Sequence, residues 1–272
     1  MGEAVPANRD RQKEANVTDG VDSTAKRVPY KPKGPKGATF DPENPCLVTF
    51  KDPDSPVAEQ YRKLKTQILK MTKQDFRNTL LVTSSVSGEG KSVTCANLAI
   101  MLAREYGQTV LLVDADLRKP SLQDYLGLRS IYGLADCLDS RIDVGRAIVK
   151  TGMPKLSFLS AGKKVANPAE LLSSDRMKQF LAEVKHRYRD RYIIIDTPPA
   201  LLYAETLALS MQVDGVVVVV KEGVASMDGV RETLNVLKGA SLLGIVYNDV
   251  SAAKLDGSYY DYDKYYKKAQ KH

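Results

Sequence analysis

Residues 85–92, "SVSGEGKS", form a stretch of small side chains that ends in a lysine and a hydroxyl group. The stretch follows an apolar run at 79–84 and leads into a helical pattern at 90–106. Backbone N–H groups in such a loop can surround phosphate oxygens, and the start of the following helix adds partial positive charge. The loop therefore predicts a phosphate-binding site, against the alternative of a plain turn between strand and helix.

The end of this loop matches the pattern G-x-x-x-x-G-K-[ST], although Ser85 replaces the first glycine. Lys91 would reach the β- and γ-phosphates of a nucleotide, and the Ser92 hydroxyl would bind Mg²⁺. We therefore expect ATP and Mg²⁺ as cofactors. The predicted nucleotide-binding residues of the loop are Ser87, Gly88, Glu89, Gly90, Lys91, Ser92 and Val93.

Carboxylates follow two further apolar runs. "VLLVDADLRKP" at 110–120 leads into Asp114 and Asp116, and "YIIIDTPPA" at 192–200 leads into Asp196. Each aspartate alone could cap a loop or a helix. Because the carboxyl ends of parallel strands face one ligand crevice, the three strand ends together supply the groups of a magnesium and nucleotide site. The predicted catalytic residues are Lys91, Asp114, Asp116 and Asp196, and the predicted metal ligands are Ser92, Asp116 and Asp196.

The apolar runs themselves predict the fold class. They are continuous rather than alternating, which indicates strands covered on both faces, as in a parallel sheet with crossover helices. Ser55 and Pro56 mark the start of a helix before the first strand. We predict an α/β fold with a doubly wound, mostly parallel sheet of the P-loop NTPase type and helices on both faces. The predicted strands are 79–84, 109–113, 192–195, 215–220 and 244–247, and the predicted later helices are 90–106, 175–188 and 226–238.

The two ends of the chain lack this periodicity. Residues 1–50 are rich in Pro, Gly, Lys and Asp, so we predict a disordered arm there, followed by a P-loop domain over 51–256. Residues 257–272 are predicted to form a flexible tail, which could deliver a phenol to an active site. The alternative is a sticky aromatic strand or end. A cluster of five tyrosines, interleaved with Asp and Lys, favours the flexible tail over the aromatic strand: Tyr259, Tyr260, Tyr262, Tyr265 and Tyr266.

Composition argues against several other classes of protein. The net charge is +7, but no dense basic block appears, so no nucleic-acid partner is expected. The apolar run at 215–221 is far shorter than the roughly 20 residues of a membrane-spanning helix, and the N-terminus lacks a signal-peptide core. We therefore expect a cytoplasmic protein. Cys46, Cys95 and Cys137 have no C-x-x-C spacing, which predicts free thiols.

These motifs together carry a resemblance to a known family. Gly90-Lys91-Ser92, "LLVDADLRKP" and "IIIDTPP" resemble the Walker A, A′ and B motifs of the bacterial tyrosine kinases that regulate capsular and exopolysaccharide synthesis and chain length. The similarity runs from about residue 55 to the C-terminus and includes "NPAELLSS" at 167–174. It also includes the family's E-x-x-R-x-x-R motif, which lies on a helix used for ring-like self-association, in the form Glu59, Arg62 and Lys65. Lysine in place of arginine loses the bidentate fork geometry.

The resemblance implies a non-specific protein-tyrosine kinase that uses ATP to autophosphorylate the tail tyrosines, mainly in trans between protomers. In this scheme Asp114 accepts the tyrosine proton. Arg118 would stabilise phosphate charge, unless it is an ordinary surface charge on a loop. In related P-loop ATPases an asparagine at the position of Asn248 contacts the adenine base, and a turn residue is the alternative. Arg118 and Asn248 are therefore predicted to bind the nucleotide.

The resemblance also implies partners. We expect a homo-oligomeric ring such as an octamer, and a cognate tyrosine phosphatase. A separate membrane activator, part of the polysaccharide chain-length machinery, would recruit the cytoplasmic kinase to the inner face of the membrane.

The same motifs are compatible with a second function, that of a switch ATPase. A partitioning or positioning ATPase of the same P-loop branch, a switch that binds DNA or membrane, would share all three motifs. It would not need a tyrosine cluster, and the membrane-binding kind would use a basic amphipathic C-terminal helix, whereas this tail has no apolar face. An iron-sulfur scaffold would need paired cysteines, which the sequence lacks.

Overall fold

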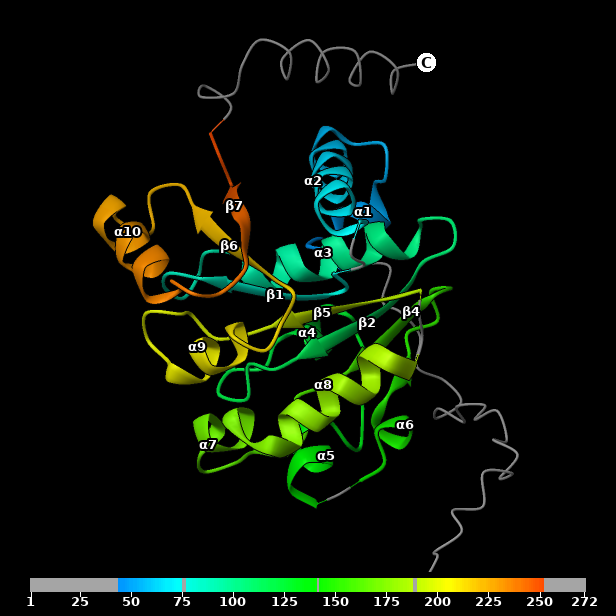
Figure 1. Cartoon of the computed structure of the whole chain (residues 1–272). Helices are drawn as coiled ribbons and strands as arrows, with labels where there is room; N and C mark the ends of the chain where they lie inside the picture. The colour runs from blue at the N-terminus through cyan, green and yellow to red at the C-terminus, as the bar shows by residue number, and fades with distance from the viewer. Residues whose placement is uncertain (1–43, 75–76, 141, 188–189, 252–272) are drawn as a thin grey trace, which may run out of the picture. The chain divides into compact units, whose positions relative to one another are not determined.

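The protein is described by a computed structural model that covers residues 44–74, 77–140, 142–187 and 190–251. Within these residues one sheet has the strand order β3-β4-β2-β5-β1-β6-β7 (Figure 1). Every neighbouring pair is parallel except β3 and β4. The predicted fold class is confirmed. The strands are β1 (Thr79–Ser84), β2 (Thr109–Asp114), β3 (Val149–Lys150), β4 (Leu156–Leu159), β5 (Arg191–Asp196), β6 (Gly215–Lys221) and β7 (Leu242–Asn248).

Helices cover both faces of the sheet (Figure 1). Helices α1 to α4 pack on one face, and α5 to α10 lie on the other. In the described part of the chain the helices are α1 (Val48–Lys51), α2 (Pro56–Thr72), α3 (Lys91–Ala103), α4 (Leu122–Tyr125), α5 (Leu134–Ser140), α6 (Val144–Ala147), α7 (Pro168–Ser173), α8 (Asp175–Arg187), α9 (Ala204–Ser210) and α10 (Met227–Val236).

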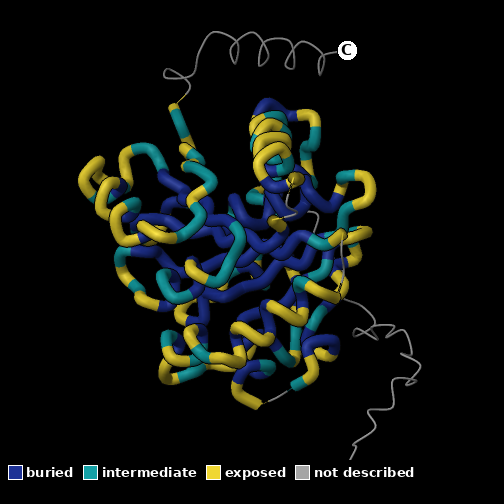
Figure 2. The backbone as a smooth tube through the Cα atoms, in the orientation of Figure 1, coloured by how far each residue is buried: buried dark blue, intermediate teal, exposed yellow. Residues whose placement is uncertain are grey.

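The central strands are buried on both faces, as their continuous apolar sequences predicted (Figure 2). Successive side chains of a strand point to opposite faces. Thus Leu80 and Val82 of β1 enter the core under α3, whereas Leu81 enters the core under α8. This double burial explains why the strands show no polar alternation.

All five predicted strands are present, and the helix predicted to begin after Ser55 is confirmed. Ser55 is the N-cap of α2, with its Oγ accepting a hydrogen bond from Ala58 N at 3.2 Å, and Pro56 is the first helical residue. The sequence did not predict β3 and β4, which have only two and four residues. Strands this short give too few positions for an apolar pattern to be recognised.

The N-terminal boundary of the folded domain differs from the prediction. Residues 44–50, predicted as part of the disordered arm, are packed against α3. The Leu47 side chain is 1% exposed, and Thr49 N donates to the Asn97 Oδ1 atom at 3.0 Å. Asn97 Nδ2 in turn donates to Cys46 O at 2.7 Å. This segment is too short to show a helical period, which is why its sequence did not reveal it. Residues 1–43 and the tail from 252 lie outside the described residues.

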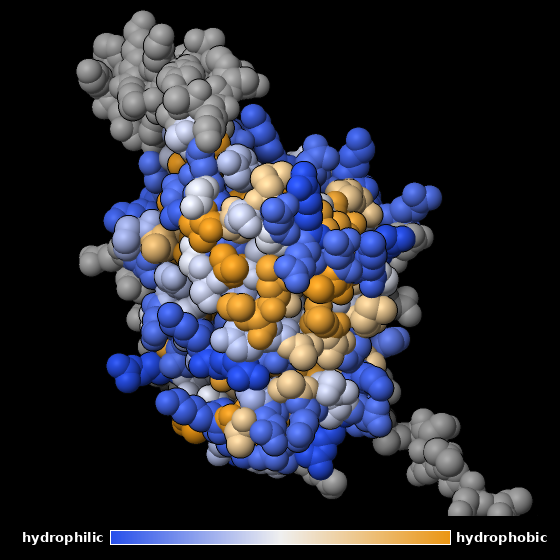
Figure 3. Space-filling view, turned by 90° about the vertical axis from the view of Figure 1, so that its left-hand side faces the viewer, coloured by the Kyte–Doolittle hydropathy of each residue, from blue (hydrophilic) through white to orange (hydrophobic). Residues whose placement is uncertain are grey.

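Among the described residues, no helix combines the length and the apolar character that crossing a membrane requires. Figure 3 shows the side of the molecule on which α9, α10 and β7 lie, with apolar side chains gathered in the middle of the face. On β7, which pairs with β6 along one edge, Leu242, Ile245 and Tyr247 are exposed.

Replacing Leu47 tests whether residues 44–50 belong to the folded core. Leu47→Ala should lower the free energy of unfolding by about 2–4 kcal/mol, because it leaves a cavity beneath α1. Urea unfolding measures the change. Val57→Ala on α2 is a control, since that side chain is 45% exposed and its loss should cost about 0.5 kcal/mol or less. Equal, small effects of the two substitutions would contradict the packed segment.

Candidate active site

The loop that follows β1 has the backbone shape of a phosphate-binding loop. Gly88 and Gly90 have φ angles of +88° and +86°, a left-handed region that favours glycine. Lys91 is the first residue of α3, so the N-terminal end of that helix points into the loop. Ser85, at the position of the missing first glycine, is buried, and its Oγ accepts a hydrogen bond from Thr233 Oγ1 at 2.8 Å. The replacement is therefore accommodated by a contact with α10.

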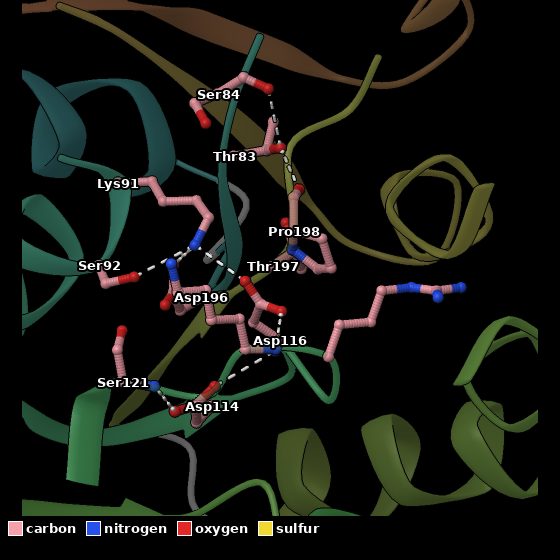
Figure 4. A network of polar contacts seen from close by, with 12 residues as sticks. Thr83, Ser84, Lys91, Ser92, Asp114, Asp116, Ser121, Asp196, Thr197 and Pro198 are labelled. Atoms are coloured by element: carbon pink, nitrogen blue, oxygen red, sulfur yellow. Dashed lines mark hydrogen bonds and ion pairs between the residues drawn. The ribbon is translucent and has the colours of Figure 1, made fainter. Parts of the chain in front are cut away.

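The structure brings the four predicted catalytic side chains together at the carboxyl ends of β1, β2 and β5 (Figure 4). Asp114 and Asp196 are register partners on adjacent strands. Lys91 Nζ lies 3.0 Å from Asp116 Oδ2 and 3.9 Å from Asp196 Oδ1. It also donates to Ser92 Oγ at 3.2 Å. One ammonium group thus lies between two carboxylates and the hydroxyl that was predicted to bind metal, with Asp114 next to Asp196 on the adjacent strand.

Burial dominates the electrostatics of this cluster. It raises the pKa of Asp196 to about 6, although the nearby Lys91 ammonium acts in the opposite direction. Burial, together with the charge of Asp196, also raises the pKa of Asp114. Burial alone would lower the pKa of Lys91, but the carboxylates of Asp196 and Asp116 outweigh it and raise that pKa. Lys91 is therefore charged, and it compensates only part of the acidic cluster.

The donor set fits a magnesium ion bound with a nucleotide. Both carboxylate oxygens of Asp196 are buried and, among the described residues, neither accepts a well-aligned hydrogen bond, although the Ser92 hydroxyl and the Lys91 ammonium lie nearby. Such orphaned acceptors indicate a missing ligand, because buried polar atoms are normally satisfied. The described residues contain no group of three side chains that would form a complete protein metal site. Mg²⁺ does not need one, since it binds through one or two carboxylates, phosphates and water. Ser92, Asp116 and Asp196 would hold it.

Asp114 has a different environment from the other two aspartates. Its Oδ2 accepts hydrogen bonds from Ser121 N and Leu122 N, both at 3.1 Å, and its Oδ1 accepts one from Asp116 N at 3.2 Å. Charge-assisted bonds to backbone N–H groups are strong. Asp114 therefore fixes the loop between β2 and α4, and this loop carries Asp116 into the site.

Arg118, predicted to contact the nucleotide, is paired within the protein in this structure. Its guanidinium donates from Nη2 to Glu205 Oε2 at 3.4 Å and also binds Oε1 through Nε. The same group lies 4.6 Å from the centre of the Tyr203 ring. The Glu205 side chain is 1% exposed, so moving Arg118 onto a phosphate would leave a buried carboxylate without its partner. Glu205 and Tyr203 were missed because they are far from Arg118 in the sequence.

Two other predicted nucleotide-binding residues contact the loop itself. The Glu89 carboxylate is buried and accepts backbone hydrogen bonds, so its side chain cannot face a phosphate. Asn248, at the end of β7, donates from Nδ2 to Glu89 O at 2.9 Å. Ser87 and Gly88 are exposed at the outer bend of the loop, and Val93 is half-buried in the first turn of α3.

The predicted oligomerisation residues lie on α2, away from the acidic cluster. Arg62 pairs with Glu59 and donates to Pro53 O at 3.0 Å. Lys65 pairs with Glu105 and is 17% exposed in its side chain. The tail tyrosines 259, 260, 262, 265 and 266 lie outside the described residues.

The fold and this loop define the class as a P-loop nucleotide-binding domain, and comparison with known proteins agrees. The family model described as an AAA domain matches residues 78–242. The tyrosine-protein kinase YwqD of Bacillus subtilis is 35% identical over 211 residues, which cover 76% of this chain and 87% of the relative. The tyrosine-protein kinase CpsD of Streptococcus agalactiae is 32% identical, with 78% and 91% covered. Among solved structures, the kinase domain of the Escherichia coli tyrosine kinase ETK superposes with a TM-score of 0.71 at 25% identity, covering 77% of this chain and 82% of that one.

The chain belongs to the family of bacterial tyrosine-protein kinases. It spans nearly the whole length of YwqD and CpsD, but the matched region covers only 27% of the putative tyrosine-protein kinase EpsB of Ralstonia solanacearum.

Replacing Asp196 tests how the acidic cluster affects stability. Folding raises the pKa of the Asp196 carboxyl from 3.8 to about 6. The contribution of this group to the free energy of unfolding therefore falls as the pH rises between those two values. In the absence of Mg²⁺ and nucleotide, Asp196→Asn should therefore increase the free energy of unfolding at pH 7 by about 1–3 kcal/mol. The gain should disappear near pH 4, as urea unfolding at both pH values would show.

Asp228→Asn is the matched control, because that side chain is 90% exposed, and it should change stability little at either pH. Lys91 keeps a carboxylate partner in Asp196→Asn, because Asp116 still pairs with it. A loss of stability at pH 7 would mean that the attraction of Asp196 to Lys91 outweighs the cost of its burial.

Proposed function

We propose that this protein is an ATP-dependent protein-tyrosine kinase that autophosphorylates its C-terminal tyrosine cluster in trans and regulates exopolysaccharide or capsule synthesis and chain length. The observation that carries the proposal is the position of Lys91, at the start of a phosphate-binding loop and within 4 Å of Asp116 and Asp196. The relatives named as tyrosine-protein kinases support the choice of reaction.

The site residues would divide the work of phosphoryl transfer. Lys91 and the N–H groups of the loop offset the charge of the β- and γ-phosphates, which Lys91 reaches by turning away from Asp116. Mg²⁺, when bound, neutralises phosphate charge. Ser92, Asp116 and Asp196 orient the nucleotide by holding that ion. These contacts position the γ-phosphate for attack by a tyrosine oxygen.

A carboxylate near the γ-phosphate would accept the phenol proton. A phenol with a pKa near 10 is a poor nucleophile at neutral pH, so a positioned base increases the rate. Asp114 was predicted for this role, but both of its oxygens accept backbone hydrogen bonds. We still propose Asp114 as the proton acceptor, because its Oδ1 accepts only one of these bonds and keeps a lone pair, whereas Asp116 and Asp196 are the proposed ligands of Mg²⁺.

The proposed partners rest on the relatives. A chimerical protein CapA2B2 superposes with a TM-score of 0.70 at 29% identity, covering 75% of this chain and 90% of that one. The chimerical nature of that protein, and the match to only 27% of the longer relative EpsB, support a separate membrane activator here, which would recruit this chain to the inner face of the membrane. A homo-oligomeric ring formed through Glu59, Arg62 and Lys65, and a cognate tyrosine phosphatase, complete the proposal.

The alternative of a partitioning or positioning ATPase has weaker support. McdA of Cyanthece superposes with a TM-score of 0.55 at 20% identity, a likeness that shows the fold alone. A site with the geometry found around Lys91 would serve both functions, so the destination of the phosphate decides between them.

Incubation with Mg-ATP tests the proposed reaction. The wild-type chain, with a membrane activator segment supplied, should gain phosphate on residues 259–266, as mapped by mass spectrometry. Lys91→Met removes the ammonium and should reduce incorporation by about 100-fold or more. Arg231→Met, which changes an exposed ion pair on α10, is the control and should leave incorporation unchanged. ATP hydrolysis without phosphate on these tyrosines would favour the switch ATPase.

Light scattering tests the proposed ring. Each phosphate adds about −1.5 to −2 charges, so phosphorylation makes a basic tail acidic and should release protomers from one another. We expect the measured mass to fall to that of one chain after ATP treatment. Arg62→Ala, which removes a charge from α2, should lower the mass without ATP. An unchanged mass after complete phosphorylation would contradict this regulation.

A further inference from the structure

A set of contacts outside the acidic cluster joins the phosphate-binding loop to the ends of β6 and β7. Asn248 Nδ2 donates a hydrogen bond to Glu89 O at 2.9 Å. The buried Glu89 carboxylate accepts one from Val86 N at 2.8 Å through Oε2 and one from Lys221 N at 3.3 Å through Oε1. We call Asn248, Glu89 and Lys221 the P-loop clasp.

Asn248 also packs directly against Gly90. A Cβ atom added at Gly90 would lie 2.3 Å from Asn248 Nδ2, which is closer than any two such atoms can approach. The positive φ angle favours glycine, and a side chain at this position would push the Asn248 amide away from its contact with Glu89 O. The amide and the loop backbone form one tight contact.

The clasp is anchored on the sheet. Asn248 O accepts a hydrogen bond from Glu222 N at 3.1 Å, and the next residue, Asp249, pairs with Lys221 Nζ at 2.7 Å. Asn248 is thus fixed by β6 through its backbone while its side chain reaches the loop. A rigid element of this kind can restrict a loop that contains two glycines and would otherwise sample many conformations.

We propose that Asn248 is a positioning residue, which holds the phosphate-binding loop in its binding shape before a nucleotide arrives. Glu89 completes the same restraint from inside the loop. Holding the N–H groups in place reduces the ordering cost of binding, so the clasp increases affinity for the phosphates rather than for the base. This inference rests on the nucleotide binding proposed for the loop, and it is distinct from an adenine contact by Asn248.

Hydrogen exchange on the nucleotide-free protein tests the clasp. Asn248→Ala should increase the exchange rate of the amides in residues 85–92 by about fivefold, the effect of losing one net hydrogen bond. Glu89→Gln is a second variant, because an amide offers one acceptor oxygen to two N–H donors, so either Val86 N or Lys221 N should lose its acceptor and exchange faster. Tyr247→Ala, at the exposed neighbouring position, is the control and should leave this exchange unchanged.

The result that overturns the clasp is unchanged exchange of the loop in Asn248→Ala, or an increase spread equally over β1 and β6, which would indicate a general loss of stability. Calorimetry adds a second readout. The clasp predicts that Asn248→Ala weakens binding of ATP and of inorganic tripolyphosphate by a similar factor, whereas a contact with the base would weaken ATP alone. If the wild-type chain bound no ATP, the proposed function would fail, but the exchange experiment would still decide the clasp.

Discussion

The structure depends on one interaction, the placement of the Lys91 ammonium among carboxylates that arrive from separate strands. Asp114 and Asp196 occupy paired positions on β2 and β5, and Asp116 follows in the next loop. Gathering acidic groups in a buried site is costly unless a cation accompanies them. Lys91 compensates part of this charge, and the orphaned oxygens of Asp196 remain for a metal ion. The nucleotide-free site is thus held in a state that binding of Mg²⁺ and phosphate would relieve.

Buried carboxylates also hold the loops around the site in place. Asp114 fixes the loop after β2 through backbone N–H groups, and Glu89 fixes the phosphate-binding loop in the same way. Glu205 on α9 holds Arg118 instead. In each case the acceptor is buried, so its hydrogen bonds are strong and the loop has little freedom to move. The loops can therefore present their active groups without waiting for substrate to order them.

The sequence predicted the parts of this arrangement that repeat a local pattern. Continuous apolar runs located the central strands, and the Gly-Lys-Ser ending located the phosphate-binding loop, because both features depend on neighbouring residues. The pairing of Arg118 with Glu205 could not be predicted, since it joins residues 87 positions apart and depends on how α9 packs. Glu89 and Asn248 were predicted to bind the nucleotide, and the structure adds that their side chains form hydrogen bonds to the loop and to the end of β6. Residue type indicated that these positions matter, but only the tertiary packing shows what each side chain contacts.

The relation between the acidic cluster and Mg²⁺ can be measured directly. Isothermal titration calorimetry measures the affinity of the wild-type chain for ATP, once with Mg²⁺ and once with a chelator. The difference between the two affinities is the contribution of Mg²⁺. The account predicts one nucleotide per chain, with an affinity that falls by at least about tenfold when Mg²⁺ is removed, because Asp116 and Asp196 then face the phosphates without a bridging cation. Equal affinity with and without Mg²⁺, or no uptake of ATP in either titration, would contradict it.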